Sequence, residues 1–280
     1  MKKILFFLTL FVTLMWGGKL PVIVSIIPEK TFVEAIGGDR VDVTVMVPPG
    51  SSPHTYEPKP SQMKAVAKAK LYLAVGVEFE EIWLPRFRDL NPGMQIVDIS
   101  EGITRRPMRE KRAAQSHALD PHVWTAPANV AIWVRNITRA LQAADPAHRD
   151  FYAANEKKVQ AMIAQTDAKL HALLDPLRGA KFMVQHPSWG YFADAYGLEQ
   201  LPIQIAGKSP KPRELVALVR LAQREKIRAV FVQPEASDLF AKILGRELHI
   251  PVVRISPMAP DWADNLLRLA RAIAGTTERP

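Results

Sequence analysis

The sequence predicts an α/β fold of two lobes, each a four-stranded parallel sheet flanked by helices, joined by one long rigid helix. Three observations lead to this prediction. Short apolar runs rich in β-branched residues alternate with helix-like stretches in both halves of the chain, which is the pattern of parallel sheets. A long stretch with helix periodicity separates the two halves. The length of 280 residues suits two domains, at roughly 100–200 residues each.

The first half, residues 19–145, is the expected N-terminal lobe. Helical stretches such as Lys30–Ile36 and Pro60–Ala69 lie between its candidate strands. The expected strands are Val22–Ile27, Val41–Val47, Leu71–Val75 and Gln95–Ile99.

The linking helix is expected over residues 146–175. Asp145 and Pro146 form a good N-cap and first-turn pair, and Asp175-Pro176 ends the helical pattern. The stretch between them contains no glycine or proline, so we expect a stiff connection and no wide hinge motion. One helix face carries side chains at spacings of three and four residues: Val159, Met162, Ile163, Thr166, Leu170, Leu173 and Leu174.

The second half, residues 176–280, is the expected C-terminal lobe, and it repeats the architecture of the first. Its expected strands are Lys181–Gln185, Gln200–Ile205, Ala229–Gln233 and Pro251–Ile255. The helices expected between them are Tyr191–Tyr196, Pro212–Glu225 and Leu239–Leu248.

Residues 1–18 have the pattern of an export signal peptide. Lys2 and Lys3 precede the apolar run Ile4–Trp16, which is short for a membrane span and suits a signal peptide. The cleavage site is poor, because no Ala-x-Ala precedes Gly18, so an uncleaved anchor is the alternative. Both interpretations place the folded part outside the cytoplasm. With no cysteine to carry a lipid, we expect a periplasmic protein.

Composition excludes several classes of function. The formal net charge of +9 comes from basic residues scattered among acids, so nucleic-acid binding is not expected. Because the chain has no cysteine, disulfides, zinc fingers and thiol catalysis are excluded, and a metal site must use His, Asp or Glu. The nucleophile elbow, the dinucleotide fingerprint and the phosphate-binding loop are all missing from the sequence, which argues against serine hydrolases and nucleotide binding.

Three histidines carry the candidate chemistry. His54 and His186 follow expected strands, one in each half, at the strand ends where α/β sheets bind ligands, and His122 precedes a helix. Each has prolines beside it that restrict its backbone, and neutral imidazole is the commonest protein ligand for zinc. Their separations carry no metal signature by themselves, so a solvated or capping role for each stays open at this point.

At these residues the chain resembles the metal-binding, ZnuA/TroA-type (cluster A-I) solute-binding proteins of ABC transporters. Four segments carry the resemblance, in the family's order: PHTYEPKPS at 53–61, DPHVW at 120–124, HPSWGYF at 186–192 with YGL at 196–198, and FVQP at 231–234. The resemblance covers residues 21–275. It implies two lobes with a metal ion in the cleft between them, held by His54, His122 and His186, which match the family's ligand positions one by one.

The chain departs from the family pattern in two places. The family often supplies an acidic fourth ligand after the last strand, but here Ser256 stands at that position. The fourth metal position then falls to water or to a carboxylate from elsewhere, for which Glu235 and Glu57 are the candidates. Many zinc members also carry a long loop rich in His and acids before the second ligand. Here the corresponding loop, residues 105–117, is short and basic, which argues against metal collection by this loop.

The resemblance implies a binding protein that captures Zn²⁺ and delivers it to an ABC permease, with no enzymatic activity. Three imidazoles favour zinc over Mn²⁺, which prefers more oxygen ligands. A manganese- or iron-binding member of the same family is one alternative. A zinc hydrolase is another, because three histidines and a water also form a catalytic zinc site. We expect a monomer whose partners are the metal ion and the membrane permease.

Overall fold

The computed structural model describes residues 18–108, 119–204, 210–234 and 238–275. Within them, the N-terminal lobe is built on a parallel sheet with strand order β2-β1-β3-β4. The strands are β1 (Leu20–Val24), β2 (Val41–Val45), β3 (Leu71–Ala74) and β4 (Gln95–Asp98). The helices of this lobe are α1 (Ile27–Gly37), α2 (Pro60–Val66), α3 (Glu78–Leu90) and α4 (Pro127–Ala144).

The C-terminal lobe repeats this arrangement, with strand order β6-β5-β7-β8 and all described pairs parallel. Its strands are β5 (Lys181–Val184), β6 (Glu199–Pro202), β7 (Val230–Val232) and β8 (Val252–Arg254). Its helices are α6 (Gly190–Ala195), α7 (Pro212–Arg224), α8 (Leu239–Leu248) and α9 (Trp262–Ala274). The predicted fold class, two four-stranded parallel sheets flanked by helices, is confirmed.

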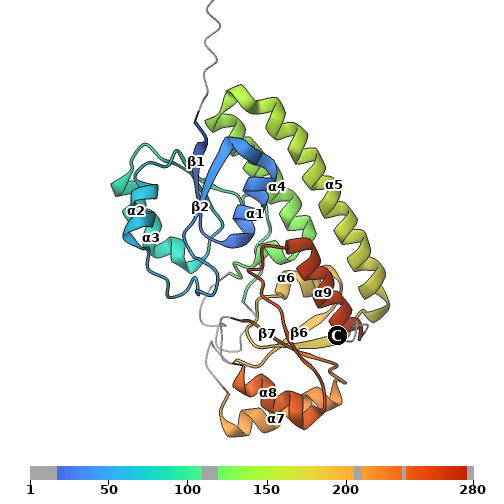
Figure 1. Cartoon of the computed structure of the whole chain (residues 1–280). Helices are drawn as coiled ribbons and strands as arrows, with labels where there is room; N and C mark the ends of the chain where they lie inside the picture. The colour runs from blue at the N-terminus through green and yellow to red at the C-terminus, as the bar shows by residue number, and fades with distance from the viewer. Residues whose placement is uncertain (1–17, 109–118, 205–209, 235–237, 276–280) are drawn as a thin grey trace, which may run out of the picture.

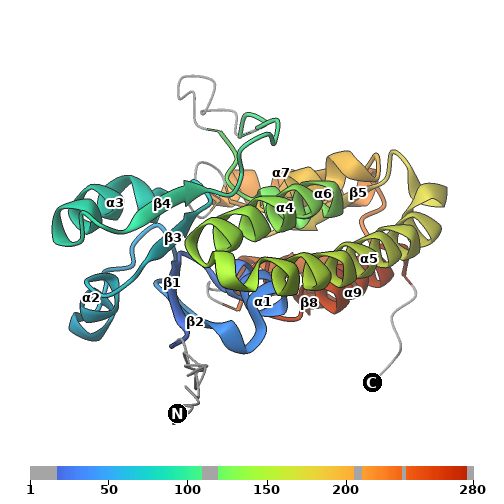
Figure 2. The ribbon, with the colours of Figure 1, turned by 90° about the horizontal axis from the view of Figure 1, so that it is seen from above.

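The long linking helix is also confirmed. The α-helix α5 spans Arg149–Leu174, and short 3₁₀ turns at Pro146–His148 and Asp175–Leu177 flank it. Its buried positions include Val159 and Ile163, which lie on the expected face. Figures 1 and 2 show α5 running along both lobes, where it packs against α1 and α4 of the first lobe and α9 of the second. One rigid element therefore spans the two lobes.

The first strand ends earlier than the apolar run Val22–Ile27 predicts. Strand β1 stops at Val24, because Ser25 and Ile26 turn the chain into α1. The Glu29 carboxylate accepts the backbone N–H of Ser25 at 3.0 Å and that of Ile26 at 2.8 Å. A buried side chain thus takes over backbone donors that a longer strand would have paired within the sheet.

Direct hydrogen bonds also join the two lobes beside their common helix. The indole N–H of Trp124 donates to the Pro257 carbonyl at 2.8 Å, and the indole N–H of Trp262 donates to the Trp124 carbonyl at 2.8 Å. The Tyr191 hydroxyl donates to the Asp120 carbonyl at 2.8 Å. These donors and acceptors are buried, and breaking such bonds without replacement costs about 1–3 kcal/mol each. Reorienting the lobes is therefore unfavourable.

We expect metal loading to leave the relative orientation of the lobes nearly unchanged. Opening the lobes would require bending α5 or breaking the buried contacts of Trp124 and Trp262. Small-angle X-ray scattering should give the same radius of gyration for metal-free and zinc-loaded protein within error. A clear decrease on loading would show that the lobes close by a hinge motion and would contradict the rigid connection.

No helix among the described residues is long and apolar enough to cross a membrane. The expected export signal at 1–18 lies outside the described residues except for Gly18.

The lobe boundaries at 145 and 176 stay predictions. Helix α9 of the second lobe also touches the first, where the rings of Trp262 and Phe32 in α1 lie 5.4 Å apart.

Candidate metal centre

The structure brings the three predicted histidines together. His54 lies in the loop between β2 and α2, His122 precedes the 3₁₀ turn Val123–Thr125, and His186 follows the end of β5. The ring centres of His54 and His186 are 5.8 Å apart, and those of His122 and His186 are 5.7 Å apart. His186 from the second lobe therefore lies between two histidines from the first lobe.

Each of the three rings has a hydrogen-bond acceptor at Nδ1. The Oε1 atom of Glu78 lies 3.2 Å from Nδ1 of His54, and Oδ1 of Asp120 lies 2.8 Å from Nδ1 of His122. For His186 the acceptor is Oε1 of Gln204, at 3.2 Å. An acceptor at Nδ1 favours the tautomer with its proton there, which leaves the Nε2 lone pair for a metal ion. The same kind of contact, an acceptor at Nδ1, thus orients all three rings.

The three histidines differ in burial and in charge. Burial, together with the neighbouring His122, lowers the pKa of His186 to about 4, so this ring is neutral at physiological pH. Its Nε2 atom is buried and has no hydrogen-bond partner among the described residues. A buried imidazole nitrogen without a partner is costly unless a ligand fills the position. This atom is the clearest sign that the cluster accepts a ligand.

His54 and Glu78 form the exposed side of the cluster. Their hydrogen bond raises the pKa of His54. Burial is the largest single influence and acts to raise the pKa of Glu78, but the hydrogen bond from His54, the charge of His54 and a backbone hydrogen bond together outweigh burial and lower that pKa to about 2. The Glu78 carboxylate is therefore ionised across the physiological range.

The spacing of the rings is close to that of a shared zinc site. Two imidazoles that bind one zinc ion tetrahedrally have ring centres roughly 5–6 Å apart, because each Zn–N bond is about 2.1 Å. As placed, however, no group of three or more His, Asp or Glu side chains in the described ranges could hold a metal ion. Binding by all three rings therefore needs a side-chain adjustment, and the exposed His54 has the most freedom to make it.

The candidates for a fourth ligand fall in different places. Glu57 is exposed, and in the described part of the chain no hydrogen bond or ion pair joins it to a histidine. The Ser256 hydroxyl accepts the backbone N–H of Met258 at 3.1 Å inside a turn. Glu235 lies outside the described residues. The sequence argument missed Glu78, whose only signal is an acidic residue just beyond the carboxyl end of β3.

A buried polar network supports the turn that carries Glu78. The Glu80 carboxylate accepts the backbone N–H of Val75 at 2.9 Å and that of Gly76 at 2.7 Å, and also the Ser25 hydroxyl. Gly76 has a φ of 85°, which favours glycine at this turn. Burial raises the pKa of Glu80 to about 7 and that of Glu29 well above its usual value. Glu29 and Glu80 are therefore two buried acids, and the charge of Glu80 helps to raise the pKa of Glu29.

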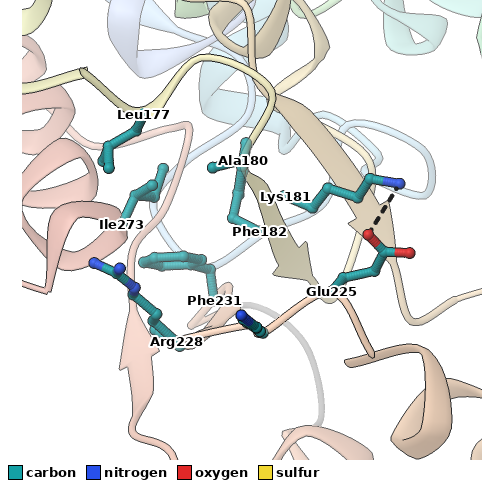
Figure 3. A pocket seen from close by; sticks show the side chains of 10 residues that line it. Leu177, Ala180, Lys181, Phe182, Glu225, Arg228, Phe231 and Ile273 are labelled. Carbon is teal, nitrogen blue, oxygen red and sulfur yellow. Dashed lines mark ion pairs between the residues drawn. The ribbon is translucent and has the colours of Figure 1, made fainter. Parts of the chain in front are cut away.

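A hollow lies in the second lobe beside the start of β5, and none of the three histidines lines it (Figure 3). It has a volume of about 160 Å³. Its floor is apolar, with Phe182 and Phe231, and its rim carries Lys181 paired with Glu225 at 3.4 Å. Because Lys181 begins β5 and His186 follows its other end, this hollow takes no part in the candidate metal centre.

Comparison with known proteins identifies a family. The pattern of the family described as "Zinc-uptake complex component A periplasmic" matches residues 22–276. A zinc-bound deletion mutant of ZnuA has a similar structure, with a TM-score of 0.85 at 36% identity, over 94% of this chain and 100% of that one.

Two of the relatives are named for different metals, one for zinc and one for manganese. The chain is 29% identical to the high-affinity zinc uptake system protein ZnuA of Bacillus subtilis, over 83% of this chain and 76% of the relative. It is 27% identical to the manganese-binding lipoprotein MntA of Halalkalibacterium halodurans, over 84% and 78%. The family match spans nearly the whole chain, and we conclude that the protein belongs to the ZnuA family of periplasmic metal-binding proteins of ABC uptake systems.

Proposed function

We propose that the protein captures Zn²⁺ outside the cytoplasm and delivers it, as a monomer, to an ABC permease. The observation that carries this proposal is the cluster of His54, His122 and His186, each with an acceptor at Nδ1 and its Nε2 left for the metal. The zinc-bound ZnuA structure and the zinc-uptake relative support zinc as the cargo. In this proposal the fourth metal position is left to water.

The donor chemistry favours zinc over manganese. Imidazole is a borderline ligand that suits zinc, whereas manganese prefers a shell rich in carboxylate and water oxygens. The carboxylates nearest the cluster, Glu78 and Asp120, are already engaged with Nδ1 atoms and act as outer partners rather than as ligands. Because one relative is named for manganese binding, the preference for zinc over manganese is measured directly in the experiment below.

The same two contacts argue against a hydrolase. Catalytic zinc needs a general base placed to activate the bound water. Glu78 and Asp120 each accept a hydrogen bond from an imidazole, which orients the ring instead. The arrangement is that of a binding site.

We expect the protein, purified without chelators, to contain zinc, and metal-free protein to prefer zinc over manganese by at least about tenfold. The preference follows from three nitrogen donors. The measurement is elemental analysis, followed by competition titrations in which manganese is offered against a zinc-loaded sample. Tighter binding of manganese than of zinc at equal free concentration would overturn zinc as the cargo while leaving the family membership intact.

A further inference from the structure

The cluster has one exposed side, and Glu78 lies on it. The Glu78 and His54 side chains are 42% and 43% exposed, whereas those of Asp120 and His122 are 3% and 10% exposed. His186 is also largely shielded, and its Nε2 is buried. A hydrated ion that comes from solvent therefore meets Glu78 and His54 before it meets the other two histidines.

The charge of the protein makes this side important. The chain carries a formal net charge of +9, which repels a divalent cation at long range. The histidines carry no negative charge that could compensate, and the Asp120 carboxylate is shielded from solvent. Glu78 is the carboxylate that the described site places at its solvent-exposed side.

The position of Glu78 is built into the fold. It is the first residue of α3, and it follows the turn in which the buried Glu80 carboxylate accepts the backbone N–H groups of Val75 and Gly76. This clamp fixes where α3 begins. The Glu78 carboxylate is therefore held beside Nδ1 of His54 rather than moving freely like an ordinary surface acid.

We propose that Glu78 is the capture carboxylate of the site: it attracts the hydrated zinc ion at the exposed side and hands it to Nε2 of His54. This inference rests on the proposed zinc-binding function. Glu78 first holds the ion through its water shell, in keeping with the hard character of a carboxylate oxygen. Glu78 then keeps its hydrogen bond to Nδ1–H of His54 while the imidazoles replace the water molecules around the ion. The carboxylate therefore sets the rate of zinc loading, and the final protein ligands are imidazole nitrogens.

The test is a stopped-flow measurement of zinc association and dissociation with three forms of the full chain. The reporter is tryptophan fluorescence, because the Trp124 ring lies 5.3 Å from that of His122. The variants are Glu78→Gln and, as the matched control, Glu81→Gln, which removes one exposed negative charge from the same helix α3. Thermal melts of the metal-free proteins check that both variants fold.

We expect Glu78→Gln to slow zinc association about tenfold at low ionic strength, with little change in the dissociation rate. The difference from the wild type should shrink at high salt, because salt screens the attraction. Glu81→Gln should bind zinc at the same rate as the wild type at every salt concentration.

Two results would overturn the capture role. One is faster dissociation of Glu78→Gln with unchanged association, which would make Glu78 only a positioning residue for His54. The other is equal slowing by Glu81→Gln, which would assign the effect to surface charge in general. Failure of the wild type itself to bind zinc would instead remove the proposed function, so the two failures are distinguishable.

Discussion

Replacing His186 by alanine is expected to weaken zinc binding by more than about a hundredfold, since loss of an outer partner alone costs about 10–100-fold. His186 is the ring that lies near both others, at 5.8 Å from His54 and 5.7 Å from His122. It is also the histidine whose low pKa, about 4, keeps its nitrogen free of protons at neutral pH. Removing it leaves the remaining two rings without their common neighbour. The measurement is a calorimetric titration of metal-free protein with zinc.

The matched control is His171→Ala. His171 lies near the end of α5, where its Nδ1 is 3.0 Å from Asp175, and it is remote in the fold from the candidate centre. This variant should bind zinc like the wild type. Equal zinc affinity of His186→Ala and the wild type would remove the three-histidine site, provided that melts show both variants folded.

The buried acid Glu80 is expected to make the metal-free protein more stable at pH 5 than at pH 8. Burial raises its pKa to about 7 from the usual 4.5, so the folded state binds the proton more tightly than the unfolded state does. This contribution is fully present below about pH 4.5 and is lost as the pH rises through about 7. It amounts to about 3 kcal/mol of unfolding free energy. Glu29, whose pKa is also raised, acts in the same direction.

Substituting Glu80→Gln isolates this contribution. Thermal melts at pH 5 and pH 8 give, for each protein, the difference in stability between the two pH values. This difference should be smaller in Glu80→Gln than in the wild type. Glu81→Gln is the control, because the neighbouring Glu81 is exposed. All three proteins keep the same histidine cluster, so the comparison isolates the substituted side chain. Identical pH dependence of wild type and Glu80→Gln would show that Glu80 does not titrate in this range.

Much of the fold follows from local patterns in the sequence. Each expected strand overlaps an observed one. The signal is clearest for central strands such as β3 and β7, which are buried throughout and are therefore continuous apolar runs. The linking helix was predictable from its stop signals and its apolar face at Val159 and Ile163. The end of β1 was not predictable, because it depends on Glu29, a charged residue whose burial against Ser25 and Ile26 is a tertiary event.

The candidate site was predictable only in part. The three histidines were predicted as ligands because their loops resemble the ligand loops of a known family. Their spacing along the sequence alone gave no reason for them to lie together. Glu78 escaped the sequence argument because nothing in an acidic first turn of a helix distinguishes an ordinary dipole-stabilising residue from one that contacts His54. Its role depends on where the Glu80 clamp places the start of α3, which only the folded chain shows.

Zinc-edge X-ray absorption of the protein loaded with one equivalent of zinc shows directly whether His54, His122 and His186 bind the ion through their Nε2 atoms. We expect three imidazole nitrogens at about 2.0–2.1 Å with one further light donor. The same spectrum of His186→Ala, recorded with excess zinc, should lose one imidazole. A shell dominated by carboxylate oxygens, with fewer than three imidazoles in the wild type, would refute the three-histidine site.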